Sequence, residues 1–250
     1  MTNPTLTKSI PRHGQGGADM NAAIDIRGLT KHYGSVRALD GLDLSLEGGR
    51  ITGLLGQTGC GKTTLLKVLA GVLAGYTGDV RIAGHAPGPE SKARVSFLPD
   101  TSFLPDSARI RDCLRMYRDF FADFDQAKAE NMLAGFGLPE SLRLKEASKG
   151  MREKVQIALV MSRRAQVYLL DEPISGVDPA AREVLLDGIV ANLAHDALVL
   201  ISTHLVHDLE PVLDSVVIMR DGRTLLTGDV DDLRAEHGKS LDAIFREMHR

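Results

Sequence analysis

Apolar and polar residues alternate in three short stretches near the start of the chain, a pattern that predicts half-exposed β-strands. These stretches are residues 24–26, 42–46 and 80–82. Residues 51–55, between the last two, are largely apolar and have the length of a strand buried on both faces. We therefore expect a buried sheet with an antiparallel β edge subdomain beside it.

A different pattern begins at about residue 107, where apolar side chains recur at the three- and four-residue spacing of amphipathic helices. The residues of one such face are Leu114, Tyr117, Phe121 and Phe124. Asp125 is placed to cap a following helix, which Gly137 would end. These features predict a helical insert at approximately residues 107–150.

Apolar strands return after the insert, at residues 167–170, 198–201 and 215–219. A helical pattern separates the first two of these strands. The Asp221-Gly222 pair after the third strand is typical of a tight hairpin. Strands that alternate with helices in this way predict an α/β fold with a mixed or mainly parallel sheet.

Composition narrows the class of protein. The formal net charge is −3, without the basic excess of a nucleic-acid-binding protein, so we expect no nucleic-acid partner. No apolar run reaches the length of about eighteen residues that would indicate a membrane-spanning helix. Two cysteines in 250 residues fit a reducing compartment. We expect residues 1–22 to be a flexible extension and residues 23–250 to form the folded domain.

The most specific chemical feature is the loop after the strand at residues 51–55. Its residues are Gly56, Gln57, Thr58, Gly59, Cys60, Gly61, Lys62, Thr63 and Thr64, with the phosphate-binding pattern G-x-x-x-x-G-K-T. Glycines let the backbone wrap closely around an anion, and the N-terminus of the following helix adds a partial positive charge. We expect Lys62 to reach the β- and γ-phosphates of a nucleoside triphosphate and Thr63 to bind Mg²⁺. The loop therefore predicts a P-loop NTPase core.

Two acidic residues, Asp171 and Glu172, end the strand at residues 167–170. Ligands of parallel sheets bind at the carboxyl ends of the strands, which is where these carboxylates are placed. Asp171 is the candidate Mg²⁺ ligand, through a water molecule, because Mg²⁺ keeps several waters. Glu172 is the candidate group that polarises the attacking water.

With these residues in place, the chain resembles the nucleotide-binding subunits of ATP-binding-cassette (ABC) transporters over about residues 24–228. The other matching segments are Lys31-His32-Tyr33-Gly34, Ala147-Ser148-Lys149-Gly150-Met151, Ser175-Gly176-Val177-Asp178 and Ser202-Thr203-His204. They occur in the order that the family shows, and this order is more specific than any one segment. The Ser-Lys-Gly-Met signature and the acidic residue at position 100 are similar to those of ABC-2 type exporters.

The resemblance implies a role for each segment. Tyr33 would stack on the adenine of ATP. Asp178 lies at the position of the family's D-loop and is included among the candidate ATP-binding residues. His204 would hydrogen-bond the γ-phosphate and help to position the water. Ser148 and Gly150 would contact ATP held by a second nucleotide-binding subunit, either another copy or a paralogue, so that two chains enclose two ATP molecules.

Two segments depart from the family pattern. Asp100 stands where the family has a glutamine, and an ionised carboxylate accepts hydrogen bonds but donates none. Asp100 can still bind a Mg²⁺-bound water, so it is included among the candidate metal ligands. In the signature, Ala147, Lys149 and Met151 differ from the usual residues, whereas the phosphate-contacting positions are retained.

The resulting hypothesis is an ATPase that drives a separate transmembrane permease, in an exporter, from the cytoplasmic face of the membrane. A soluble ABC ATPase without a permease, acting in cluster assembly or on ribosomes, is the alternative. A P-loop kinase or GTPase would have no use for Ser148, Gly150 and His204, and no N-K-x-D guanine motif occurs.

Overall fold

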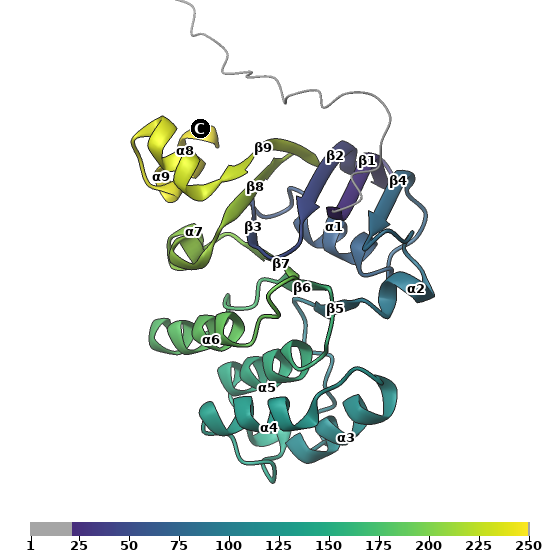
Figure 1. The fold of residues 1–250 in the computed structure, drawn as a ribbon, viewed down its shortest axis with the longest axis vertical. Helices are drawn as coiled ribbons and strands as arrows, with labels where there is room; N and C mark the ends of the chain where they lie inside the picture. The colour runs from purple at the N-terminus through teal and green to yellow at the C-terminus, as the bar shows by residue number, and fades with distance from the viewer. Residues whose placement is uncertain (1–21, 250) are drawn as a thin grey trace, which may run out of the picture.

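The structure, a computed structural model, describes residues 22–249, and their strands form two sheets (Figure 1). The strands of the smaller, antiparallel sheet, in the order β2-β1-β4, are β1 (Ala22–Tyr33), β2 (Val36–Glu47) and β4 (Thr77–Ile82). The larger sheet has the order β5-β6-β7-β3-β8-β9. Its strands are β3 (Ile51–Leu55), β5 (Val95–Leu98), β6 (Val167–Asp171), β7 (Leu198–Thr203), β8 (Ser215–Arg220) and β9 (Arg223–Asp229).

The larger sheet is parallel except for β9, which pairs antiparallel with β8. The expected α/β fold with a mixed sheet and an antiparallel edge subdomain is confirmed. The hairpin between β8 and β9 is also confirmed, because Asp221 and Gly222 both have positive φ, 51° and 75°. The expected flexible extension, residues 1–22, lies outside the described residues except for Ala22, which begins β1.

Helix α1 (Lys62–Leu69) joins the two sheets in one apolar cluster. Its buried residues Leu65 and Leu66 share this cluster with Ile24 of the smaller sheet and Leu200 of the larger one. Burial of each such side chain stabilises the fold by about 1.5–3 kcal/mol. The packing therefore fixes the helix whose N-terminus adjoins the phosphate-binding loop.

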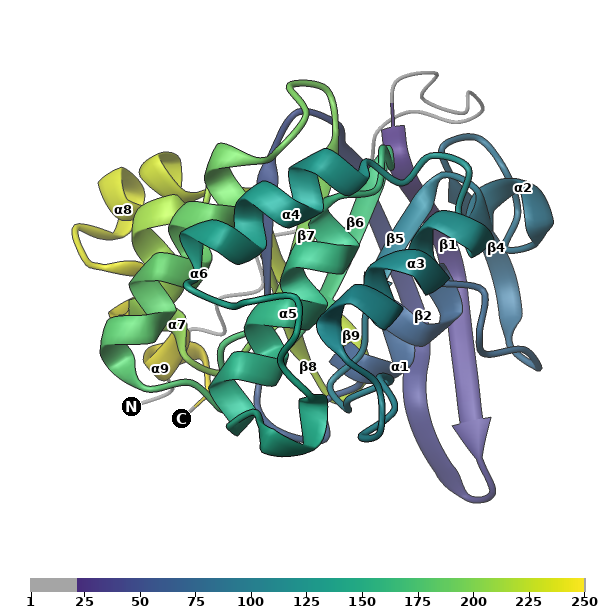
Figure 2. The same cartoon turned by 90° about the horizontal axis from the view of Figure 1, so that it is seen from below.

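The opposite face of the larger sheet is covered by helices, as Figures 1 and 2 show. These are α5 (Lys149–Met161), α6 (Pro179–Ala191), α7 (Val206–Leu209), α8 (Val230–His237) and α9 (Leu241–Met248). Strand residues alternate between the two faces: Tyr168 and Leu170 lie in the helix-covered cluster, whereas Val167 and Leu169 pack toward α1. This burial on both faces explains why the parallel strands of the larger sheet are largely apolar.

The remaining helices are α2 (Pro89–Lys92), α3 (Ile110–Phe120), α4 (Gln126–Gly135) and the 3₁₀ segments Leu144–Glu146 and Glu210–Val212. The Asp125 cap is confirmed, since its carboxylate accepts a 3.0 Å hydrogen bond from the Lys128 N–H. No helix within residues 22–249 combines the length and the apolar character that a membrane span requires.

The single helical face expected at Leu114, Tyr117, Phe121 and Phe124 is wrong in one respect. Helix α3 ends at Phe120, and Phe121 is already extended. The rings of Phe121 and Phe124 nevertheless pack on Tyr117, with centroids 5.0 and 5.4 Å from it. Arg163 stacks on the Phe121 ring, 4.1 Å from its centroid, a tertiary contact at the helix end that sequence spacing does not reveal.

Candidate nucleotide-binding and hydrolysis site

The candidate residues lie at the carboxyl ends of four adjacent parallel strands. Asp100 follows β5, Asp171 ends β6, His204 follows β7 and Gly56 follows β3. The strand register places Asp171 opposite Ser202 and Leu55 opposite Thr203. Segments as far apart in the sequence as Gly56 and His204 are therefore brought to one edge of the sheet, where ligands of such sheets bind.

The phosphate-binding loop depends on glycine at three positions. Gly59 and Gly61 have φ values of 85° and 108°, which other residues adopt only with strain. A β-carbon at Gly61 would overlap the Ala38 carbonyl oxygen, and one at Gly56 would lie 2.7 Å from the Met219 carbonyl oxygen. Cys60 fills space inside the loop, and burial raises the pKa of its thiol, which makes it a packing residue at neutral pH.

Lys62 begins α1 and is buried at the centre of the site. Its Nζ donates hydrogen bonds to the carbonyl oxygens of Gly56, at 2.7 Å, and Gln57, at 3.3 Å. The same Nζ lies 4.0 Å from Oε1 of Glu172. Lys62 thus connects the loop to the acidic end of β6.

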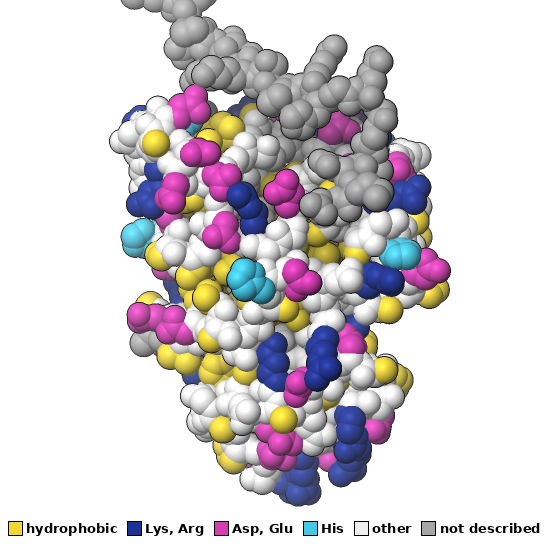
Figure 3. All heavy atoms as spheres, viewed as in Figure 1, with side chains coloured by type: hydrophobic (Ala, Val, Ile, Leu, Met, Phe, Trp, Pro, Cys, Tyr) yellow, Lys and Arg dark blue, Asp and Glu magenta, His cyan; other side chains and the backbone are white. Residues whose placement is uncertain are grey.

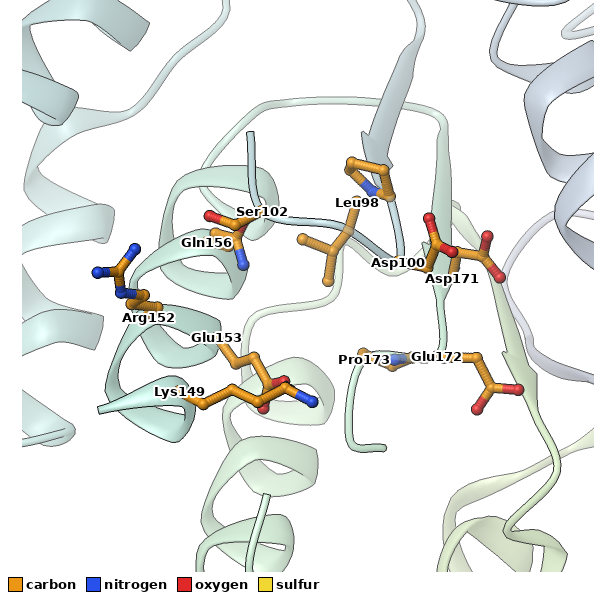
Figure 4. A pocket seen from close by; sticks show the side chains of 11 residues that line it. Leu98, Asp100, Ser102, Lys149, Arg152, Glu153, Gln156, Asp171, Glu172 and Pro173 are labelled. Carbon is orange, nitrogen blue, oxygen red and sulfur yellow. The ribbon is translucent and has the colours of Figure 1, made fainter. Parts of the chain in front are cut away.

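Asp171 is a buried carboxylate with one oxygen free. Its Oδ1 accepts a 2.5 Å hydrogen bond from the Ser202 hydroxyl, whereas Oδ2 has no hydrogen-bond partner among the described residues. Burial raises the pKa of Asp171 above its ordinary value, the negative charge of Asp100 acts in the same direction, and the Ser202 hydrogen bond opposes them. Asp100 and Asp171 lie side by side in Figure 4.

A divalent cation fits this arrangement, because it would neutralise two adjacent carboxylates and give the free Asp171 oxygen a partner. The Thr63 hydroxyl also lies beside Asp171, where it lowers the pKa of that carboxyl. No group of three or more His, Cys, Asp or Glu side chains within residues 22–249 could hold a metal by itself. A Mg²⁺ ion here would therefore take most of its ligands from phosphate and water.

Glu172 adopts an unusual backbone conformation, with φ of 50°. Such a conformation costs of the order of 1 kcal/mol and persists only where surrounding contacts enforce it. Its N–H lies 3.0 Å from the hydroxyl oxygen of Ser202 and 3.2 Å from the carbonyl oxygen of the same residue. This geometry directs the carboxylate to His204, whose Nδ1 is 2.9 Å from Oε2 of Glu172.

Ser202 was not among the candidates from sequence, although it contacts both acidic residues. The available signal was its position: it lies one residue before the end of a parallel strand next to the strand of Asp171, two residues before His204. In a parallel sheet, residues at corresponding strand ends face the same edge. A hydroxyl there can serve two neighbours, since it donates to Asp171 and accepts from Glu172.

Tyr33 is the last residue of β1 and is about half exposed. It pairs with Val36, and the carbonyl of Ala38, two residues further, abuts Gly61 of the loop. Its ring also faces Lys31, whose Nζ is 5.3 Å from the ring centroid. The structure therefore places an exposed aromatic ring on the hairpin that adjoins the phosphate-binding loop.

Ser148 and Gly150 lie at the N-terminus of α5 and not against the loop. Ser148 caps the helix by accepting a 3.2 Å hydrogen bond from the Met151 N–H. A β-carbon at Gly150 would lie 3.9 Å from Val177, in the segment that leads from Glu172 to Asp178. The Asp178 carbonyl in turn accepts from the Arg182 N–H at the start of α6. Within residues 22–249 no hydrogen bond or ion pair links residues 147–151 to the phosphate-binding loop.

A pocket of about 80 Å³ separates α5 from the ends of β5 and β6 (Figure 4). Charged side chains from both sides line it, among them Asp100, Asp171, Glu172, Lys149 and Glu153. None of the residues that line this pocket belongs to the phosphate-binding loop, so it lies on the α5 side of the acidic strand ends.

The arrangement of loop, acidic strand end and histidine can be compared with known proteins. The model of the ABC transporter family matches residues 39–175. This chain belongs to the ABC transporter family. Membership implies that it binds ATP and hydrolyses it, as ABC ATPases do.

Two curated relatives are similar over most of this ABC protein. One is the daunorubicin resistance ATP-binding protein DrrA3 of Streptomyces coeruleorubidus, 31% identical over 91% of this chain and 75% of the relative. The other is the Nod factor export ATP-binding protein I of Paraburkholderia xenovorans, 30% identical over 83% of this chain and 71% of the relative. Both names describe ATP-binding proteins.

Solved structures of ABC ATPases have the same fold as this chain. An ATP-binding subunit of an ABC transporter superposes with a TM-score of 0.81 at 28% identity, covering 91% of this chain and all of that one. The ADP conformation of the cassette MJ1267 superposes with a TM-score of 0.70 at 20% identity, covering 84% of this chain and 92% of that one. At 20% identity, the similarity to MJ1267 concerns the fold alone.

Proposed function

We propose that this chain is the ATP-hydrolysing subunit of an exporter. Two copies, or one copy and a paralogue, enclose two ATP molecules and drive a separate permease. The connected set Lys62, Glu172 and His204, next to the free oxygen of Asp171, carries this proposal. The name of the Nod factor relative, which describes export, supports the direction of transport.

The residues of the chain suggest how hydrolysis proceeds. The N–H groups of the loop and Lys62 would hold the phosphates, for which Lys62 exchanges its hydrogen bonds with the loop carbonyls. Glu172 would accept a hydrogen bond from the attacking water, and His204, hydrogen-bonded to it, would fix the direction of the carboxylate. Thr63 and Asp171, with Asp100 beside them, would hold Mg²⁺, which would neutralise charge on the phosphates.

The exposed surface of the insert supports a permease at the cytoplasmic face of the membrane. Phe120 ends α3 and is 77% exposed, the largest exposed fraction among the large apolar side chains within residues 22–249. Phe103 is also exposed, and its N–H donates a hydrogen bond to Oε1 of Gln156 in α5. Elsewhere the face in Figure 3 carries Lys and Arg interspersed with Asp and Glu, without a large field of one sign. Exposed aromatic residues are typical anchors of protein interfaces.

The hydrolysis part is tested with Glu172→Gln. The variant should bind ATP as the wild type does, hydrolyse it at least about 100-fold more slowly and accumulate as an ATP-bound dimer in size-exclusion chromatography. Glu183→Gln, an exposed change on α6, is the matched control and should behave as the wild type. Hydrolysis at the wild-type rate in Glu172→Gln would place the base elsewhere.

The permease part is tested with Phe120→Ser. The wild-type chain should fractionate with the membranes of its host, and the variant should appear in the soluble fraction while its basal ATPase activity is unchanged. Val72→Ser, at an exposed residue just after α1, is the control. A wild-type chain that never fractionates with membranes would favour the soluble ABC ATPase.

A further inference from the structure

Lys149 occupies the first position of α5, between Ser148 and Gly150. Its side chain lies directly over Gly176, where a β-carbon would overlap both Cε and Nζ of Lys149. The same β-carbon would overlap Oε1 of Glu153, one helical turn further along α5. Lys149, whose side chain is 72% exposed, and the more buried Glu153 therefore lie against a backbone position where a β-carbon would displace the ends of both side chains.

Glu153 is a mostly buried carboxylate on α5 that forms an ion pair with Lys149. Its side chain is 16% exposed, and Oε2 has no hydrogen-bond partner among the described residues. Burial raises the pKa of this carboxyl, and Lys149, with Nζ 3.8 Å from Oε1, is the charge that opposes the shift. Without Lys149, the Glu153 carboxylate would be left unpaired under the loop, which is costly in a partly buried site.

Gly176 belongs to the segment that begins at Glu172. The Ser175 N–H donates a 3.2 Å hydrogen bond to the Glu172 carbonyl, so a hydrogen-bonded turn from Glu172 to Ser175 leads directly into Gly176. Figure 4 shows Lys149 and Glu153 on α5 facing the strand end that carries Glu172. Contact at Gly176 thus links the candidate base of a chain to the helix start that carries Ser148 and Gly150.

We propose that Lys149 and Glu153 act as one positioning unit: Lys149 neutralises the mostly buried Glu153 carboxylate, which would otherwise disturb the packing of the segment after Glu172 against the start of α5. Lys149 thereby keeps Ser148 and Gly150 oriented toward the ATP of a second subunit. The inference rests on the proposed function, because it assigns these residues to contact between two subunits. Neither Lys149 nor Glu153 has to touch ATP. Through this unit, the position of Ser148 and Gly150 at one ATP depends on the position of Glu172, which acts on the other ATP.

The test is a double-mutant cycle in the Glu172→Gln chain. Lys149→Met should weaken ATP-dependent dimerisation about tenfold in analytical ultracentrifugation, whereas Glu153→Gln should change it less than about threefold. The double variant should recover to within about threefold of the parent, because the unpaired carboxylate is gone. Affinity of the monomer for a fluorescent ATP analogue should stay unchanged throughout, and Lys149→Arg should keep dimerisation intact.

A second pair of variants tests the contact at Gly176. Gly176→Ala should displace Lys149 and reproduce the defect of Lys149→Met. Gly135→Ala, where a β-carbon meets no atom within 4 Å, is the matched control and should have no effect on dimerisation.

The outcomes separate this inference from the proposed function. A double variant as defective as Lys149→Met would mean that Lys149 acts on the ATP of the partner directly, and would overturn the positioning unit. If the parent chain forms no dimer with ATP, the proposed function fails. The positioning unit is then tested by the same cycle, with the free energy of unfolding of the monomer measured in urea. Changes that simply add for Lys149→Met and Glu153→Gln would overturn the unit, whereas a double variant more stable than Lys149→Met would support it.

Discussion

Asp171 illustrates at the scale of one residue how a site built for a cation lowers the stability of the protein around it. The carboxyl is buried, one oxygen is unpartnered and Asp100 lies beside it. Its pKa is held above the model-compound value of 3.8, which means that folding favours the protonated form. At neutral pH the ionised carboxylate therefore reduces the free energy of unfolding, and this cost is lost as the pH falls through the raised pKa.

We therefore expect Asp171→Asn to be more stable than the wild type by about 1 kcal/mol at pH 7, because it keeps the shape and removes the buried charge. The difference should shrink as the pH is lowered through the pKa of Asp171. Urea unfolding of both proteins at several pH values measures this. Asp187→Asn, an exposed change on α6, is the control; a gap between wild type and Asp171→Asn that widens at low pH would contradict the assignment.

Lys62 gives the second residue-scale prediction. Lys62→Ala should weaken ATP binding at least about 100-fold, since the ammonium is the only cation bonded to the loop carbonyls within residues 22–249. Isothermal titration calorimetry measures the affinity, and thermal unfolding checks that the variant is folded. Lys92→Ala, an exposed lysine at the end of α2, should bind as the wild type does. Equal affinities for Lys62→Ala and wild type would show that phosphate is bound elsewhere.

At the scale of elements, the parallel strands and the loop could be predicted because their signals are local. Apolar runs, a Gly-rich turn and acidic strand ends identify the edge of the sheet that carries the site. The end of α3 could not be predicted in this way, because the residue that follows it, Phe121, packs against Arg163, forty-two residues later, and such a contact is not local. Ser202 was missed for a related reason: its role depends on which strand lies next to β6, and strand order is not local information.

The attachment of the insert to the sheet yields an element-scale prediction. Buried Arg163 donates to the Val95 carbonyl at 2.7 Å and forms two 3.1 Å hydrogen bonds with Asp123. Arg163→Met should therefore lower the free energy of unfolding by about 2–3 kcal/mol, allowing for the partial exposure of Asp123.

The neighbouring residue provides the control for this change. Arg164 carries the same charge, but its side chain is 77% exposed against 6% for Arg163. Arg164→Met should cost less than about 0.5 kcal/mol. Chemical denaturation of both variants tests the pair, and similar losses would mean that Arg163 does not hold the insert.

At the scale of the whole molecule, the candidate residues divide into two groups. Lys62, Asp171, Glu172 and His204 meet at one edge of the sheet, whereas Ser148 and Gly150 open α5, which no hydrogen bond or ion pair within residues 22–249 links to the phosphate-binding loop. A single chain therefore does not bring both groups to one phosphate. The proposed dimer would do so twice, by a two-fold arrangement in which each chain supplies the loop of one site and the helix start of the other.

Mixing two inactive variants tests this arrangement. Lys62→Ala lacks a working loop and Ser148→Arg blocks the helix start, so neither should hydrolyse ATP alone. A mixed dimer contains one site with both parts intact. An equal mixture should thus recover about a quarter of the wild-type ATPase activity, since half of the dimers are mixed and each has one site of two. A chain with both changes, mixed with Lys62→Ala, can form no intact site and should recover nothing. If the first mixture also recovers nothing while both variants are folded and dimerise, ATP is hydrolysed within a single chain.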